Sequence, residues 1–183
     1  SRQQREPYSP HGAWQRVRHV SLDREALGAE AFAERVAGLE PAVVMDLICF
    51  TPEDNRALVA ALRGRVEHFL HCGTIWVHGH ATQVPTTEEA ARRPFGEYGV
   101  NKAAIERDLL LEARQNGFPA TVLHPGHIVG PGWEPLNPQG NFNPKVFEML
   151  ARGDELKLPN FGLETVHHVH ADDVAQGFEK ALT

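Results

Sequence analysis

Three short apolar runs, separated by helix-like segments, constrain the fold of this 183-residue chain more than any other feature. They cover residues 42–49, 68–74 and 120–126. The first is nearly continuous, which is typical of a parallel strand buried on both faces. Amphipathic helical patterns precede the first run, at 29–39, and separate it from the second, at 51–62. This alternation predicts right-handed βαβ units in a parallel α/β sheet.

Smaller signals place the remaining elements. Thr51 and Pro52 suit the N-cap and first position of a helix that ends near Leu62. The alternation at 16–20 predicts a short strand before Asp23. Beyond Gly130 we expect an irregular segment, a helix at 144–152, strands at 156–158 and 167–170, and a helix at 171–182.

Composition excludes several classes of protein. The hydrophobic share of 42% suffices for a core, and one domain is the expectation for this length. The net charge is −6 and the basic residues are scattered, which argues against nucleic-acid or anionic-membrane binding. No apolar run approaches the roughly 20 residues that cross a bilayer. Cys49 and Cys72 lie in apolar runs, so we expect free thiols in a reducing cytoplasm.

Tyr98 and Lys102 form the pattern that carries chemistry. Four residues apart at the start of a helix, they share one face and lie one turn from each other. An ammonium there favours the phenolate and pulls the tyrosine pKa down from about 10. Such a phenol can exchange a proton with a substrate hydroxyl near neutral pH. Thr74, just after the second run, is placed to hold the same oxygen, and the set suits alcohol–ketone interconversion.

The order of these motifs resembles the extended short-chain dehydrogenase/reductase superfamily, specifically its NAD(P)-dependent epimerase/dehydratase family. In that family a strand ends in Ser or Thr and is followed by V-Y-G, then Y-x-x-x-K, then a strand with R-P-x-N-x-Y-G-P. Here the corresponding segments are Cys72–Thr74, Val77–Gly79, Tyr98–Lys102 and His124–Gly132. The resemblance covers nearly the whole chain.

The resemblance implies a role for each matching residue. It implies that Thr74, Tyr98 and Lys102 are catalytic and that NADP or NAD is the cofactor. The implied cofactor-binding residues are Arg2, Asp23, Leu47, Ile48, Cys49, Tyr98, Lys102, His124, Pro125 and His127. Arg2, with Arg5 nearby, suits the 2′-phosphate of NADP, although a solvated basic loop is the alternative. Asp23 lies where family members contact the adenine, although a plain turn residue is the alternative.

One family signature is missing. No glycine-rich phosphate loop, such as G-x-G-x-x-G, occurs in the sequence. We therefore expect an internal piece of a chain of about 300 residues. The expected fold is a Rossmann-like doubly wound parallel sheet without its N-terminal βαβ unit, spanning 1–130. Residues 131–183 would then begin a small substrate-binding lobe.

Histidines replace family residues on the expected substrate side. His78 stands for the tyrosine of V-Y-G, and His127 stands for the asparagine of R-P-x-N, so both are candidate substrate residues. Val129 stands for a further tyrosine, which weakens the case for a nucleotide sugar. The eleven histidines also suggest a metal, but residues three apart on a strand point to opposite faces and no H-E-x-x-H occurs. We expect no metal.

The predicted function is an NAD(P)-dependent oxidoreductase or epimerase acting at a hydroxyl or carbonyl carbon of a sugar-like or other small polar substrate. Dehydration ranks lowest, because no acidic residue directly follows Thr74. One alternative is a non-catalytic nucleotide-binding regulator on the same fold, and another is an inactive fragment of the enzyme. The resemblance also implies a homodimer, through the helix that carries Tyr98 and its predecessor.

Overall fold

Parallel strands form the larger sheet of this chain. The structure is a computed structural model, and it describes residues 10–81 and 83–182. The strands are β1 (Val43–Asp46), β2 (His68–Cys72) and β3 (Ala120–Leu123), in that order across the sheet. β1 pairs in parallel with β2, with Asp46 opposite His71. The predicted α/β class with a parallel sheet is confirmed.

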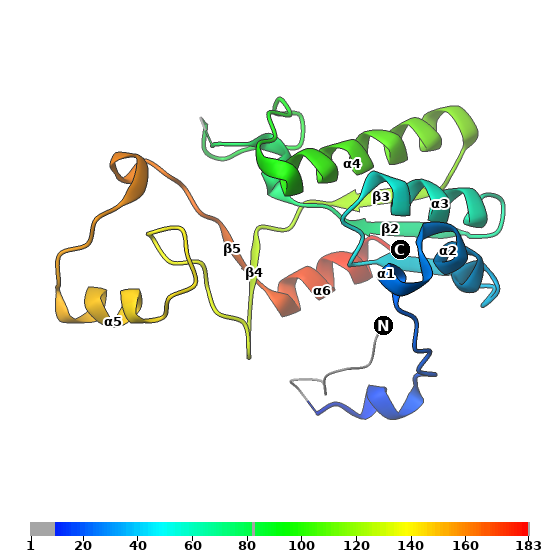
Figure 1. Ribbon diagram of the computed structural model, residues 1–183, viewed down its shortest axis with the longest axis horizontal. Coiled ribbons are helices and arrows are strands. Elements are labelled where there is room, and N and C mark those ends of the chain that lie inside the picture. Colours follow the sequence, from blue (N-terminus) through cyan, green and yellow to red (C-terminus); the bar gives the residue numbers. More distant parts are fainter. Residues whose placement is uncertain (1–9, 82, 183) are drawn as a thin grey trace. The chain divides into compact units, whose positions relative to one another are not determined.

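Three helices supply the core around this sheet (Figure 1). They are α2 (Ala29–Ala37), α3 (Pro52–Leu62) and α4 (Gly96–Asn116). Their inner side chains bury Phe69 of β2 completely, together with Leu58, Ile105 and Leu109. As predicted, α3 begins at Thr51, whose Oγ1 accepts a hydrogen bond from the Asp54 amide at 3.3 Å. The short helix α1 (Arg24–Leu27) precedes α2.

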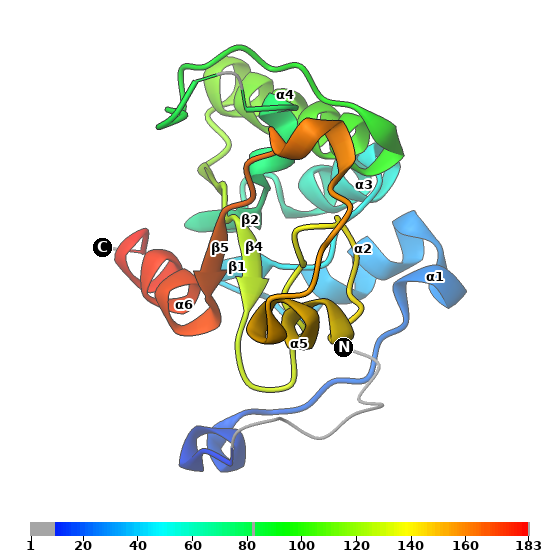
Figure 2. The ribbon, with the colours of Figure 1, turned by 90° about the vertical axis from the view of Figure 1, so that its left-hand side faces the viewer.

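A second, smaller sheet pairs β4 (His127–Val129) with β5 (His168–His170) in parallel (Figure 2). The helices α5 (Lys145–Arg152) and α6 (Ala171–Lys180) belong to the same part of the chain. Gly126, just before β4, lies very close to the backbone of His167, just before β5. A Cβ added at Gly126 would lie 2.5 Å from the His167 carbonyl oxygen. A side chain at this position would therefore push the two strands apart.

The chain divides into two compact units. One reaches Cys72 and also holds Asn101–Val122, which includes the three-stranded sheet up to its last residue. The other holds Gly73–Val100 and the residues from Leu123 onward. The division predicted at residue 130 into a cofactor domain and a substrate lobe stays a prediction.

Several predicted elements differ from the structure. The strand predicted at 16–20 is wrong. Arg16 ends a 3-10 helix, η1 (Gly12–Arg16), and residues 17–20 form no strand. The strand at 156–158 is wrong for the same reason. β1 is shorter than the run at 42–49 and is not buried on both faces, because Val43 and Met45 are exposed. β4, in contrast, was not predicted.

Within residues 10–81 and 83–182, no helix combines the length and the apolar character that a bilayer crossing requires.

Candidate functional site

Helix α4 carries both members of the predicted Tyr/Lys pair in its first two turns. The helix begins at Gly96, so Tyr98 and Lys102 lie one turn apart near its N-terminus, as predicted. Their environments differ strongly: Tyr98 is 46% exposed, whereas Lys102 is only 2% exposed. The phenol can thus meet a ligand, while the ammonium is held inside the protein.

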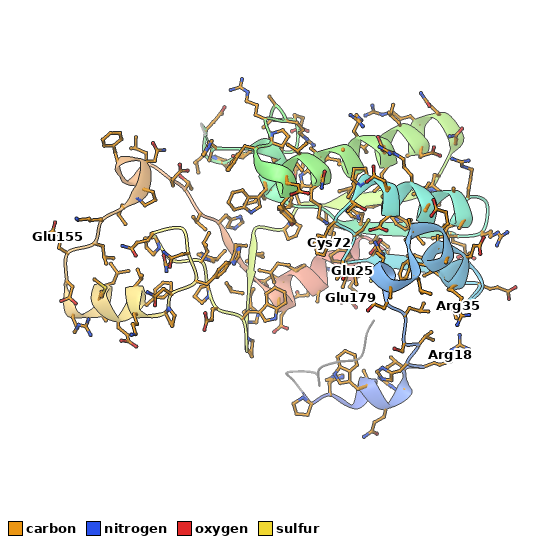
Figure 3. The ribbon with its side chains drawn as sticks, in the orientation of Figure 1. Arg18, Glu25, Arg35, Cys72, Glu155 and Glu179 are labelled. Carbon is orange, nitrogen blue, oxygen red and sulfur yellow. The ribbon has the colours of Figure 1, made fainter. Side chains whose placement is uncertain are left out.

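Buried Lys102 is fixed at the carboxyl end of β2. Its Nζ donates a hydrogen bond to the carbonyl oxygen of Cys72 at 2.8 Å. Cys72 is labelled in Figure 3. The ring of Phe50 lies 5.1 Å from Nζ, within cation–π range. Burial lowers the pKa of Lys102, which a charge interaction with the Cys72 thiol partly opposes. The position of the Lys102 ammonium is therefore fixed, and its favourable contacts offset only part of the cost of burying its charge.

Thr74 follows β2 and caps the 3-10 helix η2 (Ile75–His78). Its buried Oγ1 accepts a hydrogen bond from the Trp76 amide at 3.3 Å. This is the capping role that a non-catalytic threonine would also have. The hydroxyl keeps its own proton for donation to a further acceptor.

The start of α4 packs against this same turn. A Cβ added at Gly99, next to Tyr98, would lie 3.3 Å from the Trp76 carbonyl oxygen. The Trp76 ring also meets Phe95, just before the helix, with ring centroids 5.7 Å apart. Thr74 and Tyr98 therefore belong to two backbone segments that are in direct contact.

A buried ion pair shapes the carboxyl end of β1. The Arg24 guanidinium bonds both Asp46 oxygens, at 3.0 and 3.1 Å, and Asp46 also accepts from the Ile48 amide at 3.3 Å. These contacts fix the start of the segment predicted to line the cofactor, in which Leu47 and Ile48 are exposed. Burial, reinforced by Asp46, raises the pKa of the Cys49 thiol to about 12, so this thiol stays protonated at neutral pH.

Histidines occupy the ends of β3 and β4. The hydrogen bonds from Gly73 N to Leu123 O (2.8 Å) and from Ile75 N to Pro125 O (3.2 Å) continue the strand pairing. Beyond them His78 and His124 meet edge to face, with centroids 5.4 Å apart. His127 contacts Phe142 at 5.4 Å and His168 at 5.6 Å. Burial, with a smaller contribution from His168, lowers the pKa of His127.

The remaining predicted residues have mixed outcomes. Arg2 and Arg5 lie outside the described residues. Asp23 caps α1, accepting hydrogen bonds from the amides of Glu25 (3.0 Å) and Ala26 (3.2 Å), and its contact with the adenine stays a prediction. Cys49 and Cys72 are free thiols, as predicted. In the part of the chain that the structure describes, no three His, Cys, Asp or Glu side chains gather as a metal site would require.

Three polar residues near Lys102 escaped the sequence interpretation: Arg24, Asp46 and His71. Asp46 and His71 are buried and directly opposite each other in the register of β1 and β2. A signal for them was present, because a carboxylate or an imidazole inside an apolar run must find a partner when the strand is buried.

Comparison with known proteins shows the family and the fold of this chain. A reductase of 2′-dehydrokanamycin from Streptomyces kanamyceticus is 34% identical over 175 residues, which cover 96% of this chain and 49% of the reductase. The chain thus spans about half the length of this curated relative. UDP-glucose 4-epimerase from Thermotoga maritima, solved with UDP-glucose, superposes with a TM-score of 0.64 at 24% identity, covering 85% of this chain and 56% of the epimerase.

The fold is also shared with dTDP-glucose 4,6-dehydratase from Bacillus anthracis in complex with NAD, at a TM-score of 0.62 and 17% identity, over 85% of this chain and 52% of the dehydratase. The predicted Rossmann-like fold is therefore confirmed. Residues 54–183 match the model of the NAD dependent epimerase/dehydratase family. The chain belongs to this NAD-dependent epimerase/dehydratase family.

Proposed function

We propose that this chain supplies the catalytic residues of an NAD(P)-dependent oxidoreductase that interconverts a hydroxyl and a carbonyl on a sugar-like or other small polar substrate. The observation that carries the proposal is the contrast on α4 between exposed Tyr98 and buried Lys102, whose ammonium is fixed on the Cys72 carbonyl. A solvated helix face would leave both side chains in water. Here Tyr98 is accessible to a substrate, while Lys102 supplies a positive charge from inside the protein.

The proposed chemistry uses three side chains. The Tyr98 oxygen takes the proton of a substrate hydroxyl, or returns one to the oxygen of a carbonyl. The Lys102 ammonium, one turn along α4, favours the phenolate form of Tyr98. The Thr74 hydroxyl donates a hydrogen bond to the same substrate oxygen and polarises it. When bound, the nicotinamide supplies or accepts the hydride.

The residues present fit one part of a dinucleotide. Lys102 can hold ribose hydroxyls through N–H groups that the Cys72 carbonyl does not use, because an ammonium has three donors. Exposed Leu47 and Ile48, beyond the carboxyl end of β1, offer an apolar lining where parallel sheets bind ligands. A phosphate-binding glycine loop is not among the 183 residues, so no pyrophosphate contact is assigned.

Among the reactions of this family we favour reduction for this chain. The relative that supports it is the 2′-dehydrokanamycin reductase, whose 34% identity extends over 96% of the chain, whereas a shared fold alone does not indicate a reaction. His78 and His127 give the substrate side imidazoles in place of the family's tyrosine and asparagine. These departures support a substrate other than a nucleotide sugar. The preference for NADP over NAD stays a prediction, because it depends on Arg2.

A paired substitution tests the proposal. Tyr98→Phe removes only the phenolic oxygen, and Tyr8→Phe, at the only other tyrosine, is the matched control. We expect Tyr98→Phe to lower kcat for NADPH-dependent reduction of keto-sugars by about 10²- to 10⁴-fold. Cofactor affinity should change little, and Tyr8→Phe should match the parent. A Tyr98→Phe variant that keeps its rate within about tenfold would contradict the proposed role.

Cofactor binding separates the alternatives. Titration with NADPH and NADH, followed by nicotinamide fluorescence, should show saturable binding. Binding without turnover on any keto-sugar or nucleotide sugar would favour the non-catalytic regulator. Failure of a folded chain to bind either nucleotide would favour the inactive fragment.

A further inference from the structure

A second polar contact of Lys102 lies outside the predicted Thr/Tyr/Lys set. Nε2 of His71 is 3.5 Å from Lys102 Nζ, and both side chains are buried. His71 is the residue of β2 just before Cys72, whose carbonyl takes the shorter hydrogen bond of the same ammonium at 2.8 Å. Two consecutive residues at the end of β2 thus face the Lys102 ammonium, His71 with its side chain and Cys72 with its carbonyl oxygen.

The protonation of His71 follows from this contact. Lys102 Nζ has only protons to offer when it is charged, so the facing Nε2 must provide a lone pair. The imidazole proton then belongs on Nδ1, and His71 is neutral. A charged His71 would place two cations 3.5 Å apart with little water to screen them.

A second acceptor matters because burial works against the charge of Lys102. Desolvation lowers the pKa of Lys102, and a buried ammonium is retained only where acceptors replace its lost water. The Cys72 carbonyl satisfies one N–H group. His71 is positioned to satisfy another, which leaves the third for a ligand.

We propose that His71 is a positioning residue for Lys102: its neutral imidazole accepts a hydrogen bond from the Lys102 ammonium and, with the Cys72 carbonyl, holds that ammonium at the carboxyl end of β2. The inference rests on the proposed function, because it assigns His71 to the charge that activates Tyr98. His71 itself touches neither substrate nor reacting atoms.

Other charged and titratable groups border this pair. From β1, Asp46 lies opposite His71 in the strand register and is itself paired with Arg24 of α1. The Cys49 and Cys72 thiols are close enough to influence Lys102 electrostatically. On α4, Glu106 is buried one turn beyond Lys102. Since none of these changes in the variants below, a difference between variants reports on His71.

Three substitutions at His71 separate its acceptor from its bulk. His71→Gln keeps a polar acceptor at about the reach of Nε2, whereas His71→Leu fills the space without one. His71→Asn is too short to reach Lys102, and it replaces His71→Leu if that variant does not fold. Phe69→Leu, two residues earlier on β2 and equally buried, is the control for a changed core without a lost acceptor.

The first readout needs neither cofactor nor turnover. The pKa of Lys102 is measured in the chain alone from the NMR shift of its ¹³Cε across pH 6–11. We expect His71→Leu to lower this pKa by about one unit, which makes the ratio of neutral to charged Lys102 about tenfold larger at a given pH. His71→Gln should restore most of the shift, and Phe69→Leu should cause none. An unchanged Lys102 pKa in His71→Leu or His71→Asn would overturn the proposal.

The second readout is the pH profile of kcat/KM. If Lys102 loses charge, the rise that reports Tyr98 ionisation should move to higher pH in His71→Leu and return in His71→Gln. A profile that stays in place although Lys102 has shifted would overturn the link to Tyr98. If Tyr98→Phe is fully active, the proposed function fails, yet the NMR titration still decides whether His71 holds Lys102.

Discussion

The two parallel sheets of this chain both carry histidines, and they surround them differently. His71 in β2 is fully buried, and its Nε2 faces the Lys102 ammonium. His127 in β4 and His168 in β5 are directly opposite each other in the register, with His127 half-buried and His168 exposed. His71 thus contacts a lysine side chain, whereas the ring of His127 contacts the rings of His168 and Phe142.

The difference teaches where this chain can hold a defined protonation state. Helices α2, α3 and α4 cover β2, so a polar group there must have a fixed partner. β4 and β5 have three residues each, and their histidines reach water. Burial thus makes His71 part of a network of fixed contacts, while the histidines of β4 and β5 keep contact with water.

The largest expected effect tests the packing side of this comparison. Phe69→Ala on β2 empties a fully buried site that Leu58, Ile105 and Leu109 surround. We expect a loss of about 4 kcal/mol in the free energy of unfolding, since buried phenylalanine-to-alanine changes cost about 3–5 kcal/mol. Urea denaturation followed by circular dichroism measures it.

Val169→Ala in β5 is the matched change in the smaller sheet. Val169 is only partly buried, so we expect a cost of about 1 kcal/mol or less. Equal losses for the two variants would mean that the two sheets are supported alike, against the comparison.

The next effect concerns the polar network at the end of β1. Arg24→Met leaves the Asp46 carboxylate, 3% exposed, without its ion-pair partner. We expect about 3 kcal/mol of destabilisation, because an unpaired charge stays buried. Arg56→Met is the control, since Arg56 is 55% exposed in its ion pair with Asp108 and should cost under about 1 kcal/mol. Similar urea midpoints for both variants would refute the buried pair's importance.

The sequence predicted correctly those features that depend on interactions between residues close together in the chain. Thr51 and Pro52 marked the start of α3 because a side-chain cap and a fixed φ act within one turn. The Tyr98/Lys102 spacing likewise predicted one face of a helix, and α4 begins where expected. The resemblance added the family and the Rossmann-like fold, both confirmed.

Non-local partners decided the rest. The alternation at 16–20 resembles a strand, but a strand forms only where a neighbour accepts its hydrogen bonds. β4 was missed for the converse reason, because three residues after Pro125 and Gly126 pair with β5 much later in the chain. The contact of His71 with Lys102 also joins distant segments, and sequence spacing alone does not reveal it.

A smaller effect probes the approach of the two short strands. Gly126→Ala would bring its Cβ to 2.5 Å from the His167 carbonyl oxygen, which accepts the His127 amide at 2.7 Å. We expect a cost of about 1–3 kcal/mol and faster hydrogen exchange at the His127 amide. Gly12→Ala, where a Cβ meets nothing within 4 Å, should leave that exchange rate unchanged. Unaltered exchange in Gly126→Ala would show that the strands can separate without cost.

The smallest effect is the acid titration of the β4–β5 pair. Burial first, and the charge of His168 second, lower the pKa of His127 in the folded chain. The folded state therefore binds fewer protons than the unfolded state, whose histidine pKa is about 6.5. The stability that neutral His127 contributes is present above that value and is lost as the pH falls through the lower folded pKa.

His168→Gln removes the second cause and keeps the first. We expect the pKa of His127 to rise but to remain below its ordinary value, as measured from the NMR shift of its Cε1 proton between pH 4 and 8. His80→Gln is the control, because His80 contacts Phe95 and Glu164 in the same unit. An unchanged His127 pKa in His168→Gln would mean that burial alone sets it. The β4–β5 pair would then resemble the β2 site, where the surroundings of a histidine, and not a second histidine, decide its charge.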